Sequence, residues 1–309
     1  MDRRSRICVA GTSTFIGSAI CRELKRDGYM NTISRHHNEP NLLDRTAVNT
    51  FFTQEKPEYV FLVAGKSAGI IGNIKYPADL MLDNLLVECH VIDAAYQHGV
   101  KKLLYLASNC CYPRHCAQPM KESSLLTGTL EPTNEPYAVA KIAGIKLVQS
   151  YRKQHGANFI CGIPANTFGL DDDFDPEDSH VVGALIFKLH EAKQQDLKEV
   201  VIWGTGKPRR EFMYVDDLAK ACVLVMHKYD DIEPVNIGPG GDVSIAELAS
   251  VIKEIVGFSG KLVFDSTKQD GMPVKLLDTN KLGKLGWRPS FSIAEGLRLT
   301  YAWYCSNIV

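Results

Sequence analysis

The stretch VAGTSTFIGSAI, residues 9–20, joins an apolar run to a helical pattern through a loop that contains Gly11 and Gly17. A short strand, a tight glycine turn and a following helix begin a dinucleotide-binding βαβ unit. The N–H groups and the positive dipole end at the start of such a helix suit a pyrophosphate. We therefore predict a dinucleotide site whose phosphate loop consists of Gly11, Thr12, Ser13, Thr14, Phe15, Ile16 and Gly17.

The same alternation of strand and helix continues through the first half of the chain. The further apolar runs are MNTISR, YVFLVAG, KLLYLAS and FICGIPAN, and helical patterns begin near Ile16, Arg45, Ala78 and Tyr137. Runs rich in Val, Ile and Leu without polar alternation are typical of parallel strands that helices cover on both faces. The predicted fold class is α/β, with a doubly wound parallel Rossmann sheet.

A second lobe is predicted where the alternation ends. After Asn166 the chain enters the acidic loop GLDDDFDPEDSH, and helices from His180 and Val215, a strand VVIWG and an amphipathic helix VSIAELASVIKEIVG follow. We expect residues 1–167 to form the nucleotide-binding Rossmann domain, to which later segments return. Residues 168–309 are expected to form mainly a smaller C-terminal α/β substrate lobe.

Composition and charge narrow the classes of partner. The 309 residues are 45% hydrophobic and 23% charged, with a net charge of −1. This balance favours neither nucleic acid nor an anionic membrane as a partner, and no stretch approaches the roughly 18 apolar residues of a membrane span. The first residues lack the pattern of a signal peptide. We expect a cytoplasmic protein.

The cysteines agree with a reducing compartment. There are nine, an odd number, and their positions do not form the paired spacing of a disulfide framework. Cys110, Cys111, His115 and Cys116 lie near one another, but zinc ligands are usually separated by two or more residues. No metal site is expected.

The stretch EPYAVAKIAG, residues 135–144, carries an acid–base pair. Tyr137 and Lys141 lie one helical turn apart and therefore on the same helix face. A nearby ammonium stabilises phenolate and so lowers the pKa of a phenol, which is about 10 in isolation. Ser108 follows the run KLLYLA and can bond to the same substrate oxygen. Together the three residues form the catalytic set of a ketone reductase.

The end of the second apolar run bears on the choice of dinucleotide. An enzyme selective for NAD usually carries an acidic residue there, which binds the ribose 2′-hydroxyl. This chain has ISRHH instead, and Arg35, supported by Ser34, matches a 2′-phosphate in a bidentate way. We therefore predict NADP as the cofactor.

With these motifs, the chain resembles the GDP-L-fucose synthases, a family of extended short-chain dehydrogenases/reductases. The matching runs extend nearly from end to end and include SNCCYP, GTLEPTNEPYAVAKIAGIKL, DSHVVGAL and VIWGTGKPRREFMYVDDLA. The resemblance implies epimerisation at C3 and C5 of GDP-4-keto-6-deoxy-D-mannose, followed by NADPH-dependent reduction of the C4 ketone to GDP-L-fucose.

The resemblance also implies roles for a cysteine and a histidine. In the family these two residues exchange the protons on C3 and C5, which the C4 ketone makes acidic; here they are Cys110 and His180. Thiol and imidazole both donate and accept protons near neutral pH. Cys111 stands where the family has an aliphatic residue, and we interpret it as packing. His180, with Tyr137 and Lys141, is also expected at the cofactor.

Further contacts and an assembly follow from the same resemblance. The implied substrate contacts are Asn166, Lys188, Trp203, Arg210 and Lys275, with the cations on the nucleotide diphosphate. A homodimer is implied, in which the helices of residues 78–98 and from Tyr137 pack against their symmetry mates as a four-helix bundle. The chain departs from the family at Ser13 and Thr14 in the glycine loop, at Asn109 and Cys111, and in GLDDDFDPED.

Particular residues argue for or against the other activities that occur on this fold. A 4,6-dehydratase needs an acidic pair beside the strand-end hydroxyl, and Ser108, Asn109 and Cys110 offer none. A 4-epimerase with bound NAD needs only the Ser, Tyr and Lys set, so this activity would leave Arg35 and the pair of Cys110 and His180 without a role. A 4-reductase without epimerisation, a synthase of a related GDP-deoxysugar such as colitose, and a catalytically silent NADP-binding regulator remain as alternatives.

Overall fold

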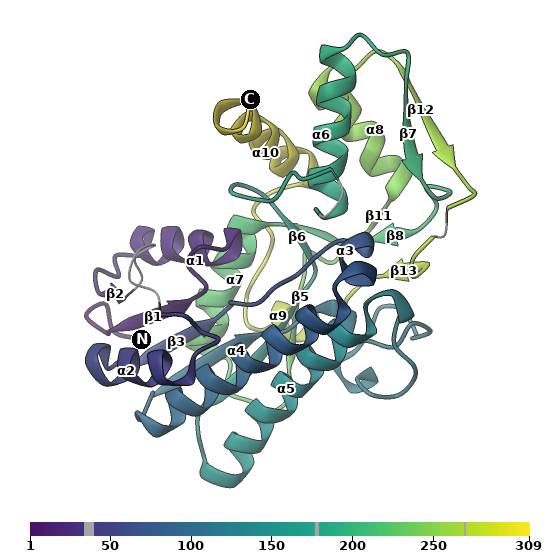
Figure 1. Ribbon diagram of the computed structural model, residues 1–309. Coiled ribbons are helices and arrows are strands. Elements are labelled where there is room, and N and C mark those ends of the chain that lie inside the picture. Colours follow the sequence, from purple (N-terminus) through teal and green to yellow (C-terminus); the bar gives the residue numbers. More distant parts are fainter. Residues whose placement is uncertain (34–39, 177–178, 269) are drawn as a thin grey trace.

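A six-stranded parallel sheet forms the centre of the larger lobe (Figure 1). The computed structural model describes residues 1–33, 40–176, 179–268 and 270–309. The strands follow the order β10-β5-β4-β3-β1-β2, and these are β1 (Ile7–Ala10), β2 (Thr32–Ile33), β3 (Tyr59–Leu62), β4 (Lys102–Leu106), β5 (Phe159–Pro164) and β10 (Val235–Ile237). The order of the strands reverses after β2, since β3 lies on the opposite side of β1, which confirms the doubly wound fold.

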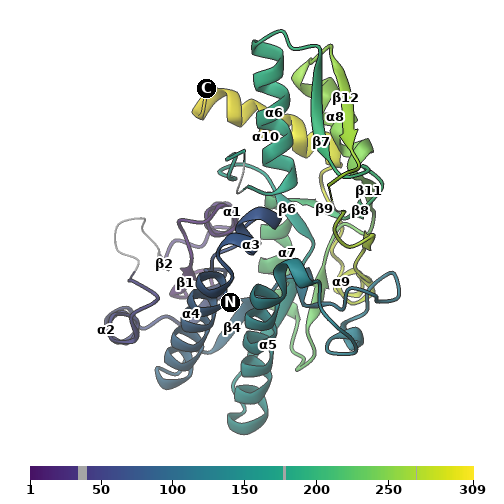
Figure 2. The ribbon, with the colours of Figure 1, turned by 45° about the vertical axis from the view of Figure 1, so that its right-hand side comes forward.

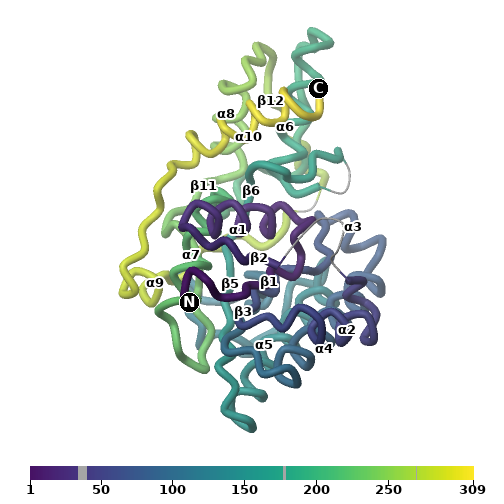
Figure 3. Tube along the Cα trace, turned by 90° about the vertical axis from the view of Figure 1, so that its left-hand side faces the viewer, coloured from purple at the N-terminus to yellow at the C-terminus, as the bar shows by residue number. Residues whose placement is uncertain are grey.

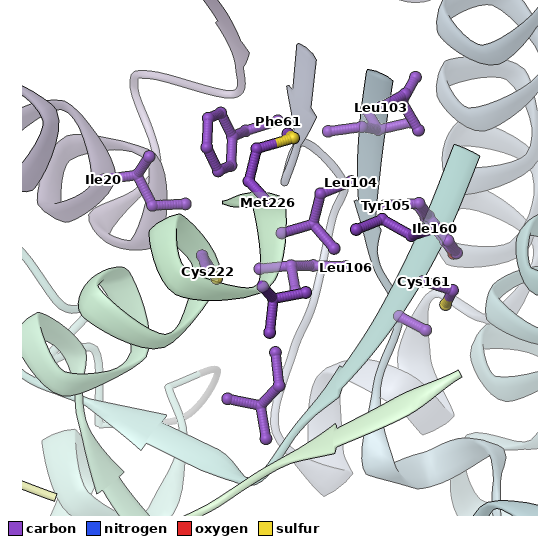
Figure 4. Packing of buried hydrophobic residues seen from close by; sticks show 14 of the residues in the cluster. Ile20, Phe61, Leu103, Leu104, Tyr105, Leu106, Ile160, Cys161, Cys222 and Met226 are labelled. Atoms are coloured by element: carbon purple, nitrogen blue, oxygen red, sulfur yellow. The ribbon is translucent and has the colours of Figure 1, made fainter. Parts of the chain in front are cut away.

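Helices cover both faces of this sheet, as the unbroken apolar strands require. On one face α1 (Phe15–Arg26) packs against α7 (Val215–Lys228); on the other lie α2 (Arg45–Glu55), α4 (Pro77–Gln97) and α5 (Glu135–His155) (Figure 2). Every residue of β1, β4 and β5 is buried. Figure 4 shows Ile20 of α1 and Met226 of α7 beside Phe61 and Leu104 of the sheet.

The smaller lobe has its own apolar core. Leu185, Leu189, Leu248 and Ile252 are buried there with Tyr304. The helices are α6 (Val181–Gln194), α8 (Ile245–Val256) and α10 (Ile293–Asn307), and the strands are β6 (Asn166–Phe168), β7 (Glu199–Trp203), β8 (Arg209–Arg210), β9 (Phe212–Tyr214), β11 (Val243–Ser244), β12 (Lys261–Asp265) and β13 (Val274–Lys275).

Two later parts of the chain lie against the first core. One consists of α7 and β10, which pairs with β5, and the other includes Leu277, Leu282 of α9 (Asn280–Lys284) and Trp287. From α9 the chain passes back to the smaller lobe and ends in α10 (Figure 3). Strand β10 was absent from the sequence prediction, as was the short helix α3 (Ile70–Lys75).

Most predicted helix starts lie within two residues of the observed ones. Helices α2 and α7 begin at Arg45 and Val215 as expected, and α1 begins one residue before Ile16. Helix α8 starts with a capping box between Ser244 and Glu247, which explains the sharp start of that amphipathic stretch. Within the described ranges, no helix has the length and apolar character needed to cross a membrane.

Candidate active site

The glycine loop between β1 and α1 is built around two close backbone contacts. Gly11 has φ +106°, and a Cβ atom there would lie 2.6 Å from the Ala64 nitrogen. At Gly17 a Cβ atom would lie 2.0 Å from the Gly11 oxygen, so α1 can begin this close to β1 only with glycine. The loop therefore fits a dinucleotide-binding turn.

Thr14, which replaces a glycine of the family pattern, caps α1. Its hydroxyl donates to the Gly11 carbonyl at 2.7 Å and accepts from the Gly17 N–H at 3.1 Å. Its φ of −82° is open to any residue, so no glycine is needed here. Among the described residues, the N–H groups of Phe15 and Ile16 have no hydrogen-bond partner and are available to an anion. Arg35, the predicted 2′-phosphate contact, lies outside the described residues.

Ser108 and Tyr137 meet at the carboxyl end of β4. Ser108 caps a short 3₁₀ turn, η1 (Asn109–Cys111), by accepting the Cys110 N–H at 3.2 Å. Its hydroxyl is also near enough to Tyr137, close to the start of α5, to act on the pKa of the phenol. Burial raises the pKa of the Tyr137 phenol and the neighbouring Cys110 adds to this, whereas the Ser108 hydroxyl lowers it. The phenol is therefore held in its protonated form at neutral pH.

Lys141 lies on the same face of α5, with Nζ 5.8 Å from the centre of the Tyr137 ring. The sequence predicted that this ammonium lowers the pKa of Tyr137, but the structure places that pKa above its usual value. Burial is the largest cause, and the charge of Lys141 is paired with Glu88, whose Oε1 lies 3.0 Å from Nζ.

The adjacent cysteines lie in different surroundings. Asn134 Nδ2 donates to the Cys110 sulfur at 3.1 Å, and Lys275 Nζ donates at 3.4 Å. Cys111 is fully buried, and burial raises the pKa of its thiol to about 12. The raised pKa therefore closes proton exchange near neutral pH to Cys111.

His180 stands just before α6 and reaches Ser67, with Nε2 3.4 Å from the hydroxyl oxygen. His180 is exposed, yet desolvation by the surrounding protein lowers the pKa of its imidazole. The charge of Asp173 opposes this shift, and the charge of Lys275 adds to it. Lys275 thus contacts Cys110 directly and acts on His180 through its charge.

The predicted substrate contacts divide into two groups. Asn166 accepts a hydrogen bond from Asn109 Nδ2 at 3.1 Å, and Arg210 stands opposite Lys275 in the β8–β13 pairing, so both lie beside the Cys110 turn. Lys188 lies on α6, and Trp203 is 52% exposed at the end of β7, with Lys268 over its ring. Within the described part of the chain, no hydrogen bond or ion pair joins these last two to the Cys110 cluster.

The fold and site match known proteins. The model of the NAD dependent epimerase/dehydratase family matches residues 7–238. The chain belongs to this family. It is 52% identical over 309 residues to a putative GDP-L-fucose synthase 2 of Arabidopsis thaliana, covering 100% of this chain and 94% of that one. The predicted resemblance to the GDP-L-fucose synthases is confirmed.

Two solved structures of this fold are also similar. A GDP-L-fucose synthetase from Naegleria fowleri bound to NADP has a TM-score of 0.90 and 27% identity, covering 100% of this chain and 96% of that one. A GDP-mannoheptose C4 reductase from Campylobacter jejuni with NADP bound has a TM-score of 0.90 and 36% identity, covering 99% of both chains.

Sequence reasoning missed two polar residues of this site. Asn134 precedes α5 and was interpreted as part of a matching run, while Glu88 lies in the apolar stretch LVECHVIDAAY. The signal for Glu88 was its position: a carboxylate on the buried face of a long helix is rarely left without a partner. Its partner could not be named, because Lys141 is 53 residues away in sequence.

Proposed function

We propose that this chain epimerises GDP-4-keto-6-deoxy-D-mannose at C3 and C5 and then reduces the C4 ketone with NADPH, forming GDP-L-fucose. One observation carries the proposal: the reductase set of Ser108, Tyr137 and Lys141 adjoins Cys110, and Lys275 connects Cys110 electrostatically with His180. A simple ketone reductase has no use for the second pair.

In the reduction, Tyr137 gives its proton to the C4 oxygen as that oxygen gains negative charge. The raised pKa keeps Tyr137 protonated at neutral pH, and Ser108 supplies a second hydrogen bond to the same oxygen. NADPH supplies the hydride when it is bound. The loop from Gly11 to Gly17 would hold its pyrophosphate, and Lys141 would hold the nicotinamide ribose.

In the epimerisation, Cys110 and His180 exchange the protons on C3 and C5. One of them takes the proton from the carbon, the C4 ketone holds the resulting charge as an enolate, and the other returns a proton on the opposite face. Lys275 stabilises negative charge on the Cys110 sulfur, because its ammonium lies 3.4 Å away. The carbon inverts without net oxidation or reduction.

The product tests this proposal and its rivals together. Incubation with GDP-4-keto-6-deoxy-D-mannose and NADPH in D₂O, followed by NMR, should give the L-fuco configuration with deuterium at C3 and C5. A D-rhamno product without deuterium would instead identify a 4-reductase, and no turnover would identify a silent NADP-binding protein. The first outcome supports the proposal and either of the others overturns it.

We expect NADPH to be the better hydride donor, because Arg35 can pair with a 2′-phosphate. At matched concentrations, NADH should give a lower kcat/KM than NADPH. Arg35→Ala should narrow this difference in kcat/KM, because it weakens the binding of NADPH and not of NADH. Arg26→Ala, at the C-terminal end of α1, should leave the difference unchanged. Equal use of the two donors by the unaltered protein would remove this assignment.

We further propose a homodimer formed by α4 and α5. These helices pack side by side on one face of the sheet, and Leu82 of α4 and Val139 of α5 remain 56% and 37% exposed. Sedimentation velocity at micromolar concentration should show a dimer, and Leu82→Arg should shift it towards monomer. Leu299→Arg, on α10, is the matched control for an exposed leucine. A monomeric wild-type protein would contradict the proposal.

We also propose that the protein works in the cytoplasm. All nine cysteines are free thiols, which suits a reducing compartment.

A further inference from the structure

A buried ion pair lies beneath the proposed reductase site. Glu88 of α4 is 1% exposed, and its Oε1 lies 3.0 Å from Lys141 Nζ. The hydroxyl of Tyr105, a fully buried residue of β4, donates to the same oxygen at 2.7 Å. We propose that Glu88 is a positioning residue for the reduction step, which fixes the position of the Lys141 ammonium. This inference rests on the proposed function.

The surrounding backbone leaves room for this cluster. At Gly144, one turn beyond Lys141 on α5, a Cβ atom would lie 2.6 Å from Glu88 Oε2 and 2.5 Å from the Tyr105 oxygen. At Gly65, after β3, a Cβ atom would lie 3.0 Å from Lys141 Nζ. Any larger residue at Gly144 would displace the Glu88 carboxylate. Three parts of the chain therefore enclose the ion pair: α4, α5 and the segment after β3.

Removal of only one partner of this ion pair is costly in free energy. A buried charge without its partner is strongly unfavourable, so loss of the carboxylate would displace the Lys141 ammonium. Burial raises the pKa of the Glu88 carboxyl, and the charge of Lys141 and the hydrogen bond from Tyr105 offset only part of that shift. With Glu88 bound to it, the ammonium lies 5.8 Å from the centre of the Tyr137 ring.

The role should be confined to one half of the reaction. Cys110 is contacted by Asn134 and Lys275, and neither belongs to the Glu88 cluster. Exchange at C3 and C5 depends on Cys110 and His180 and needs no NADPH. It therefore serves as a reference within the same protein, because a general structural defect would lower both activities.

The test uses Glu88→Gln, which keeps the shape and removes the charge. We expect kcat for NADPH oxidation to fall by roughly 10- to 100-fold, the size of effect that misplacement of a reacting group produces. KM for the sugar and the rate of deuterium exchange at C3 and C5 without NADPH should be unchanged. Tyr105→Phe, which leaves the ion pair in place, should cause a smaller loss in the same assay.

Glu122→Gln is the matched control. Glu122 is another buried carboxylate, 7% exposed, and it accepts the Asn236 N–H at 3.1 Å. This variant should not separate the two activities. Equal loss of both activities in folded Glu88→Gln, or loss of neither, overturns the inference.

A second variant covers the case in which Glu88→Gln does not fold. Glu88→Asp keeps the charge but withdraws the carboxylate by one methylene group, and a selective loss of NADPH oxidation supports the inference, while equal or absent losses overturn it. Failure of the proposed function would look different, since the wild-type protein would then neither exchange nor reduce this substrate.

Discussion

Tyr137→Phe should lower the rate of C4 reduction by roughly two to four orders of magnitude, the usual contribution of a positioned acid. The substitution removes only the phenol oxygen, which is the proton donor to the developing alkoxide. The ring itself can stay in place, because it packs near the start of α5 beside Lys141. Single-turnover oxidation of NADPH measures the loss.

Exchange of deuterium at C3 and C5 should survive in the same variant, because it depends on Cys110 and His180. Lys146→Ala, further along α5 and exposed, is a control for nonspecific effects on this helix. Parallel loss of exchange and reduction in a folded Tyr137→Phe protein would show that the two steps share their acid.

The raised pKa of Tyr137 also has a consequence for pH dependence. A phenol acting as an acid works only while it is protonated, so activity that depends on it is lost as pH rises through its pKa. Since burial places this pKa above the usual value of about 10, reduction should not fall between pH 7 and 9 through loss of the Tyr137 proton.

Cys110→Ser should abolish deuterium incorporation at C3 and C5 while leaving NADPH binding unchanged. A serine hydroxyl is too weak an acid to replace the thiol in proton exchange. His180→Asn should stop inversion in the same way. Either variant is expected to reduce the uninverted ketone slowly and to give a rhamnose-type product, which NMR distinguishes from fucose.

Cys111→Ser is the matched control, since it makes the same chemical change one residue further along. This residue is fully buried, so the hydroxyl should cost about 1–3 kcal/mol in the free energy of unfolding while exchange continues. Exchange lost in Cys111→Ser and kept in Cys110→Ser would mean that the roles of the two sulfurs are reversed.

Local patterns in the sequence determined much of this protein. The apolar runs predicted β1 to β5, the glycines at 11 and 17 predicted the turn before α1, and four-residue spacing placed Tyr137 and Lys141 on one helix face. Each of these depends on residues close together in the chain. Strand β10 was missed because its three residues join the sheet from far along the sequence.

Only the tertiary structure decided the electrostatics of the site. Lys275 contacts a sulfur 165 residues earlier, and Lys141 pairs with a carboxylate 53 residues earlier. The sequence predicted a lowered pKa for Tyr137, yet burial and the pairing of Lys141 with Glu88 leave it raised. Spacing along a helix fixes which side chains can meet, whereas a pKa depends on solvent exclusion and on every charge that the fold brings near.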